Sequence, residues 1–200
     1  MSSSISSANP PARRNRAAVK LLAIFLICAA PLVGSYVAYH YWRPSAYMNY
    51  GELLPVTPVP DVRLTTFDGT AFRLSMLRGK WVLLHADRGD CGTEQCARKL
   101  YNMRQVRLAQ GNNMERIERV WLVTDGAPPS APQPELYEGM HILRGDVATA
   151  LAALPAVGDV RDHIYLIDPA GNAMMRYPKD ADPERMIRDL KRLLKYSQAG

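Results

Sequence analysis

The sequence predicts a mixed α/β sheet with flanking helices, preceded by a single transmembrane helix. Three observations support this prediction: one long apolar run near the N-terminus, several short and continuously apolar segments typical of buried strands, and segments of helical periodicity between and after them. Of the 200 residues, roughly 135 remain for a soluble part, the usual size of a single hydrophobic core. Strands that alternate with helices favour one mixed sheet with helices on both faces.

The N-terminal region predicts a membrane anchor. Residues 1–16 are rich in Ser, Pro and Arg and are expected to form a disordered cytoplasmic tail. Residues 17–42 are mostly apolar and are long enough to cross a hydrocarbon core of about 30 Å at about 1.5 Å per residue. Three arginines in the tail and Lys20, near the start of this helix, lie on its N-terminal side, whereas only Arg43 closely follows it. This charge bias predicts a single-pass protein of the bacterial inner membrane, with a cytoplasmic N-terminus and a periplasmic C-terminal domain.

Two alternatives to an anchor are disfavoured by the residues themselves. A cleaved signal peptide would need an A-x-A-like site after a short apolar core, and a lipoprotein signal at Cys28 would need small residues where Leu26 and Ile27 stand. The formal net charge of +6 is spread without any Arg/Lys block outside the basic N-terminus. We therefore expect the inner membrane to be contacted through residues 17–42, and no nucleic acid to be bound.

The soluble part is predicted to begin after a linker. Residues 43–60 contain four prolines and no alternating pattern, which predicts an extended tether. The folded domain is then expected over residues 61–197. Its first elements are two short strands, at 61–66 and 71–74, joined by a hairpin turn at Asp-Gly.

The remaining elements follow from apolar runs and from helix boundary residues. We expect strands over 81–86, 119–125, 140–143, 163–168 and 173–177, and helices over 93–110, 148–154 and from 182 onward. Asp146 can cap the small middle helix. The last helix has Pro183 at its first position and one apolar stripe that ends in Lys and Arg.

A pair of cysteines occupies the position where such sheets build their sites. Cys91 and Cys96 lie in GDCGTEQC, between a buried strand and the helix after it. The dipole and the free N–H groups at the start of that helix favour a thiolate over a thiol. Such a pair can exchange disulfides or bind Cu(I), but two cysteines five positions apart outside the cytoplasm can also form a purely structural disulfide. Both interpretations remain open at the level of the sequence.

The order of these motifs resembles a known family. A hairpin, LRGKWVLL, a cysteine pair that opens a helix, RVWLVTD, HIYLIDPAGN and a C-terminal helix are together similar to the thioredoxin-like superfamily, in particular its Sco/SenC branch, over about residues 58 to 196. The resemblance implies a thioredoxin-like mixed sheet. It also implies a membrane-anchored protein that assists cytochrome c oxidase biogenesis by copper delivery or thiol reduction, with respiratory oxidase subunits or other assembly factors as partners.

The same resemblance assigns roles to individual residues. Cys91 would attack a partner disulfide as a thiolate and Cys96 would resolve the mixed disulfide, as in a thiol-disulfide oxidoreductase. In a copper-handling variant, the reduced Cys91 and Cys96 would hold Cu(I), with a histidine, for which His163 is a candidate, or a partner residue as the third ligand. His85 lies just upstream of the cysteine loop and is a further candidate, because it can reach that loop.

The chain departs from the family pattern at three points. Four residues separate Cys91 from Cys96, whereas Sco proteins have three and ordinary thioredoxin-like enzymes two. Val160 stands where Sco proteins place a copper-binding histidine, and VGDVRDH lacks the proline that thioredoxin-type enzymes carry before the equivalent strand. His163 is nearby, but the alternation of side chains along a strand predicts that it faces the opposite way. These departures favour the alternative hypothesis of a non-catalytic scaffold in which the cysteine pair is a structural disulfide.

A cluster on the first helix of the domain has no assigned role. Tyr101, Arg104 and Arg107 recur on its polar side. They are either a surface for a partner or a solvated face, and the sequence alone does not distinguish the two.

Overall fold

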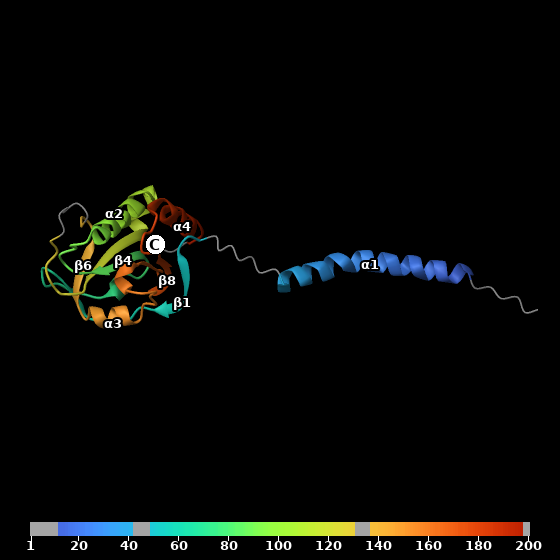
Figure 1. Cartoon of the computed structure of the whole chain (residues 1–200), viewed down its shortest axis with the longest axis horizontal. Coiled ribbons are helices and arrows are strands. Elements are labelled where there is room, and N and C mark those ends of the chain that lie inside the picture. The colour runs from blue at the N-terminus through green and yellow to red at the C-terminus, as the bar shows by residue number, and fades with distance from the viewer. Residues whose placement is uncertain (1–11, 42–48, 131–136, 198–200) are drawn as a thin grey trace, which may run out of the picture. The chain divides into compact units, whose positions relative to one another are not determined.

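The computed structural model describes residues 12–41, 49–130 and 137–197 (Figure 1). The chain divides into two compact units after residue 47. The second unit has a thioredoxin-like fold, with a mixed sheet between flanking helices.

The first unit contains one long helix, α1 (Ala12–Tyr41). Its stretch Ala18–His40 has 23 residues and a mean hydropathy of 2.3, which is long and apolar enough to cross a membrane. The helix begins five residues before the predicted transmembrane segment, so residues 12–16, which we expected to be disordered, are helical. The rest of the predicted tail lies outside the described residues. An apolar helix of this length is compatible with a single-pass anchor.

The second unit is built on an eight-stranded sheet with the strand order β1-β8-β7-β4-β5-β6-β2-β3. Strands β4, β5 and β6 are parallel to one another, and all other neighbours are antiparallel. The strands are β1 (Glu52–Pro58), β2 (Leu64–Thr66), β3 (Ala71–Phe72), β4 (Trp81–Asp87), β5 (Ile117–Val123), β6 (His141–Gly145), β7 (Ile164–Ile167) and β8 (Asn172–Tyr177). The mixed sheet is therefore as the sequence predicts.

Three α-helices cover the sheet: α2 (Glu94–Leu108) and α4 (Pro183–Tyr196) on one face, and α3 (Val147–Ala152) on the other (Figure 1). Each begins at a residue whose side chain accepts a hydrogen bond from a backbone N–H of the first turn. These residues are Thr93, Asp146 and Asp182. Such caps satisfy N–H groups that have no partner within the helix, so the helix starts are fixed by the sequence.

The alternation of side chains along β4 divides the core into two layers. Val82 and Leu84 pack in the layer that contains α3, whereas Trp81 and Leu83 pack in the layer that contains α2 and α4. Odd-numbered residues of β4 therefore face α2. The last two of that row are not apolar: they are His85 and Asp87.

The proline-rich tether predicted over residues 43–60 is wrong in its second half. Glu52–Pro58 form β1, which pairs with β8 at the edge of the sheet, where prolines are tolerated because the outer N–H groups need no partner. The segment before β1 is also held, because the N–H groups of Tyr50 and Gly51 donate to the Asp189 carboxylate at 2.9–3.0 Å. The folded unit thus begins before residue 61. Residues 42–48 lie outside the described residues.

Candidate functional site

The two cysteines of the sequence motif form a disulfide at the junction of β4 and α2. Cys91 lies in the loop after β4 and Cys96 in the first turn of α2, where its N–H donates to the Thr93 hydroxyl. Both are buried: 3% of Cys91 and none of Cys96 is exposed. Cys91 also has a φ of +42°, a left-handed backbone conformation that is uncommon and strained for a residue with a side chain. The disulfide therefore closes a tight and buried loop.

Apolar residues form the surroundings of the disulfide. Leu100 of α2 and Trp121 and Val123 of β5 are buried in the same cluster as the two cysteines. The Trp121 ring stacks on Tyr137, with 5.7 Å between the ring centroids. An environment of this kind excludes water from both sulfurs, so a partner reaches Cys91 only when the loop moves.

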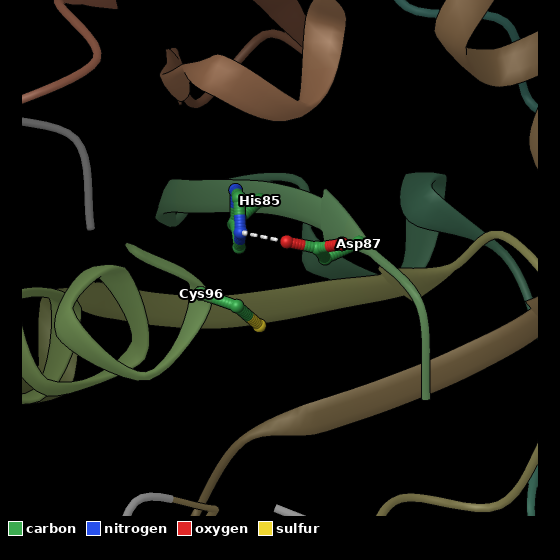
Figure 2. A group of neighbouring side chains, drawn as sticks. All are labelled: His85, Asp87 and Cys96. Carbon is green, nitrogen blue, oxygen red and sulfur yellow. Dashed lines mark ion pairs between the residues drawn. The ribbon is translucent and has the colours of Figure 1, made fainter. Parts of the chain in front are cut away.

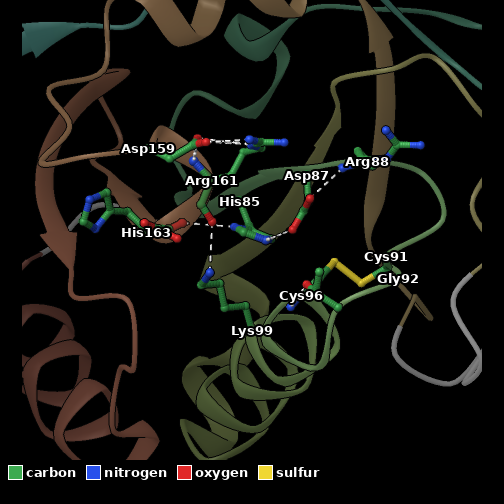
Figure 3. Close-up of polar contacts among 12 residues, drawn as sticks. His85, Asp87, Arg88, Cys91, Gly92, Cys96, Lys99, Asp159, Arg161 and His163 are labelled. Carbon is green, nitrogen blue, oxygen red and sulfur yellow. Dashed lines mark hydrogen bonds and ion pairs between the residues drawn. A yellow bond between two sulfur atoms is a disulfide. The ribbon is translucent and has the colours of Figure 1, made fainter.

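His85 lies next to this disulfide, with its Nδ1 bound to a backbone carbonyl and its Nε2 directed at the Asp87 carboxylate (Figure 3). Its Nδ1 is 3.0 Å from the backbone carbonyl oxygen of His163, which can only accept a hydrogen bond. Nδ1 therefore carries a proton in both forms of the ring. Nε2 carries a lone pair when the ring is neutral, and a second proton directed at Asp87 when the ring is charged. Nε2 is buried and has no hydrogen-bond partner among the described residues. A buried nitrogen with a lone pair is available to accept a proton or to bind a metal ion.

Asp87 faces the Nε2 of His85. Its Oδ2 lies 3.7 Å from His85 Nε2, and its Oδ1 accepts a hydrogen bond of 2.8 Å from the Arg88 N–H. Burial raises the pKa of Asp87, but the interaction with His85, the Arg88 N–H and the positive charge of Lys99 outweigh it, so the pKa lies below its ordinary value. The carboxylate is therefore ionised at neutral pH and can stabilise a positive charge on His85.

Lys99 brings an amine to the same region from α2. Its Nζ donates to the Arg161 carbonyl oxygen at 2.9 Å, and the residue is 4% exposed. Burial lowers the pKa of Lys99, while the carboxylates of Asp162 and Asp87 act in the opposite direction. Neither Asp87 nor Lys99 was predicted from the sequence to be functional. Two features of the sequence could have indicated them: Asp87 is a second polar residue on the α2 side of β4, and Lys99 is a lysine three positions after a buried cysteine.

Three side chains of this region bring together atoms of the kinds that bind metal ions. The ligand atoms of His85, Asp87 and Cys96 all lie within 4.8 Å of one another (Figure 2). In the disulfide form the sulfur of Cys96 is bonded to Cys91, so two thiolates become available only after reduction. Two thiolates and an imidazole are ligands that suit Cu(I), and the donor set of the reduced form therefore fits that ion.

The His163 side chain is not brought to the cysteine pair. Its Nδ1 bonds the Tyr177 carbonyl oxygen at 3.0 Å and its Nε2 bonds the Val157 carbonyl oxygen at 2.9 Å, so both ring nitrogens are occupied on the far side of β4 (Figure 3). The hypothesis of His163 as a Cu(I) ligand is therefore not supported by the geometry. Only the backbone of His163 reaches the site, through its bond to His85. The histidine that lies beside Cys96 is His85.

Fold and site together define a thioredoxin-like domain with a disulfide at the end of a central strand. Residues 81–197, more than half of the chain, match the family described as "Transmembrane-like, thioredoxin-like, C-terminal domain". The chain belongs to this family. A comparison of the sequence with curated proteins gives no match.

Solved structures confirm the resemblance that the sequence indicates. BsSco, described as a member of the Sco family of cytochrome c oxidase assembly proteins with a disulfide switch, is 16% identical with a TM-score of 0.55, covering 73% of this chain and 98% of that one. Yeast Sco1 with copper bound is 19% identical with a TM-score of 0.55, covering 72% and 96%. The thioredoxin domain of a thiol-disulfide oxidoreductase from Bacteroides vulgatus is 17% identical with a TM-score of 0.53, covering 70% and 98%. At such identities the likeness establishes the fold.

Proposed function

We propose that this chain is a membrane-anchored thiol-disulfide exchange protein with its folded domain in the bacterial periplasm, where it assists respiratory oxidase biogenesis. The observation that carries the proposal is the disulfide between Cys91 and Cys96, placed directly beside Nε2 of His85 and the carboxylate of Asp87. Similarity to a Sco-family assembly protein with a disulfide switch, and to a thiol-disulfide oxidoreductase, supports both the chemistry and the setting.

The exchange reaction can be written with the residues of this site. In the reduced form the Cys91 thiolate attacks a partner disulfide, which forms a mixed disulfide and releases one partner thiolate. The Cys96 thiol gives its proton to His85 Nε2, and Asp87 stabilises the imidazolium that results. The Cys96 thiolate then attacks the Cys91 sulfur and releases the second partner thiolate. The partner is reduced by two electrons, and the domain is left in the disulfide form of this structure.

The test compares cysteine variants of the full chain in its native membrane. Cys91→Ser and Cys96→Ser should leave the partner oxidised and lower the amount of assembled oxidase, whereas Cys28→Ser, which alters the third cysteine within α1, should change neither. The reduction potential of the wild-type pair should lie near those of exchange proteins, between about −120 and −270 mV. A potential well below about −300 mV, with normal oxidase in both variants, would instead establish the non-catalytic scaffold with a structural disulfide.

A second candidate function is copper handling, and it is favoured by the donor group of His85 and Cys96. Here Cu(I) is cargo, held by the two reduced cysteines with His85 as third ligand in the place of the histidine missing at Val160. Titration of the reduced full chain with Cu(I) should give one site per chain. His85→Asn should weaken that site at least about tenfold, and the matched variant His163→Asn should not. Equal affinities for wild type and His85→Asn would eliminate this arrangement.

A further inference from the structure

A second region of the domain gathers positive charge around a hollow, at the other end of α2 from the disulfide. The hollow has a volume of about 290 Å³ and is lined by Arg104, Arg107, Leu108, Arg119, Glu138 and Gly139. Among the described residues of this lining, three guanidinium groups share one concave surface with the carboxylate of Glu138. This part of the lining therefore carries more positive than negative charge, and the hollow is large enough to admit a small molecule.

Arg119 is the most unusual member because it is buried, with 2% of the residue exposed. It lies on the α2 side of β5, in one row with Ile117 and Trp121, where an apolar side chain would pack at lower cost. Its guanidinium donates to the backbone carbonyl oxygen of Glu138, which places the charge at the wall of the hollow. Burial first, and then repulsion from Arg107 and Arg104, lower the pKa of Arg119 to about 10.

The two arginines of α2 that line the hollow, Arg104 and Arg107, keep donor groups available for a ligand. They stand three positions apart, so both are on one side of the helix, and neither has an acidic residue three or four positions away. The Nε of Arg107 donates to the Ile117 carbonyl oxygen at 2.8 Å, which fixes the guanidinium by one edge. Arg104 makes no hydrogen bond or ion pair with a described residue. By contrast, Arg98 of the same helix pairs with Glu94.

We propose that Arg104 and Arg107 of α2, with Arg119 of β5 in the wall beside them, form a binding site for a phosphate group. The planar guanidinium fork matches two oxygens of a phosphate, and a doubly charged group complements the positive charge of the two arginines of α2. Leu108, the one large apolar side chain among the described lining residues, gives a surface for the organic part of a phosphate ester. The phosphate belongs either to a soluble ion or ester or to an anionic lipid headgroup, and both present the same chemistry to the site.

The first experiment measures binding of inorganic phosphate to the full chain in detergent micelles, with chloride at matched ionic strength as the reference. Arg104→Gln and Arg107→Gln should each raise the dissociation constant for phosphate about tenfold or more. The matched variant Arg98→Gln, on the same helix but outside the hollow, should leave it unchanged. Arg104 and Arg107 are half-buried, so their substitution should leave the fold intact. The urea midpoint of each variant checks this.

The second experiment separates the two sources of the phosphate. The full chain is placed in vesicles of phosphatidylcholine alone or with phosphatidylglycerol, and modification of Arg104 by phenylglyoxal is followed by mass spectrometry, with Arg98 as internal reference. Protection upon addition of phosphate in phosphatidylcholine vesicles assigns a soluble phosphate. Protection by phosphatidylglycerol without added phosphate assigns a lipid headgroup. Equal modification of Arg104 under all conditions, or protection by chloride equal to that by phosphate, overturns the proposal, and neither result affects the thiol chemistry proposed for Cys91 and Cys96.

Discussion

The two ends of helix α2 carry different kinds of chemistry. Its N-terminal end holds a buried sulfur in contact with apolar residues and with His85, whereas its C-terminal half carries half-buried guanidinium groups around an open hollow. The helix dipole suits both, because its positive end favours a thiolate and its negative end favours cations. One helix therefore supports a buried site for thiol chemistry at one end and a solvent-accessible charged site at the other. Substitutions should lower the free energy of unfolding much more at the buried end than at the exposed end.

The largest difference is expected for two leucines of the same helix. Leu100 is fully buried against the disulfide cluster, whereas Leu108 is 43% exposed at the hollow. Leu100→Ala should lower the free energy of unfolding by about 2–5 kcal/mol, because it leaves a cavity that the packed surroundings cannot fill. Leu108→Ala should cost less than about 1 kcal/mol. Urea unfolding of the full chain in detergent measures both, and similar losses would contradict the contrast between the two ends.

A smaller effect is expected at the helix start. Thr93→Ala removes the hydroxyl that accepts the Cys96 N–H at 3.1 Å, and should cost about 1 kcal/mol of unfolding free energy. Thr93→Ser keeps the hydroxyl and is the matched control, with an expected loss of less than about 0.5 kcal/mol. The same urea titrations give both values. If Thr93→Ala were as stable as Thr93→Ser, the hydroxyl cap would contribute nothing to the free energy of unfolding.

The stability contributed by the half-buried carboxylate of Asp87 should depend on pH. The pKa of Asp87 in the folded state is lowered, so it contributes stability that is fully present above the pKa of an unfolded aspartate, about 3.9, and is lost as the pH falls through the folded value. Urea midpoints should therefore fall as the pH drops below about 4, and less steeply in Asp87→Asn. Asp90→Asn, on the exposed part of the same loop, is the control substitution. Parallel acid profiles for wild type and Asp87→Asn would show that Asp87 is not held by His85.

Most of the fold was predictable because its information is local. The continuous apolar runs of β4, β5 and β7 and the capping residues of the helices identify these elements without knowledge of their neighbours. Strand β1 was missed because its residues show no alternation and include prolines. Its place is set by β8 and by Asp189, more than a hundred residues further along the chain. Contacts over such separations leave no periodic signal.

The site was predictable only where its residues are local in the sequence. Cys91, Cys96 and His85 lie close together in the sequence at a recognisable strand-to-helix junction, and all three were candidates from the sequence alone. Asp87 and Lys99 were not named, because their roles depend on which side of β4 faces α2. The arginine hollow depends on Arg119 of β5 lying beneath α2, which only the sheet order reveals.

The smallest effect is expected for the exposed ion pair of α2, and it sets the baseline for the comparison. Arg98 Nη2 lies 2.5 Å from Glu94 Oε1, but the two side chains are 54% and 84% exposed, so water and salt screen their attraction. Arg98→Gln should therefore lower the free energy of unfolding by less than about 0.5 kcal/mol, and still less in high salt. A loss above about 1 kcal/mol in urea titrations would mean that surface charge contributes more to this helix than its exposure allows. Arg98 would then no longer be a neutral reference for Arg104 and Arg107.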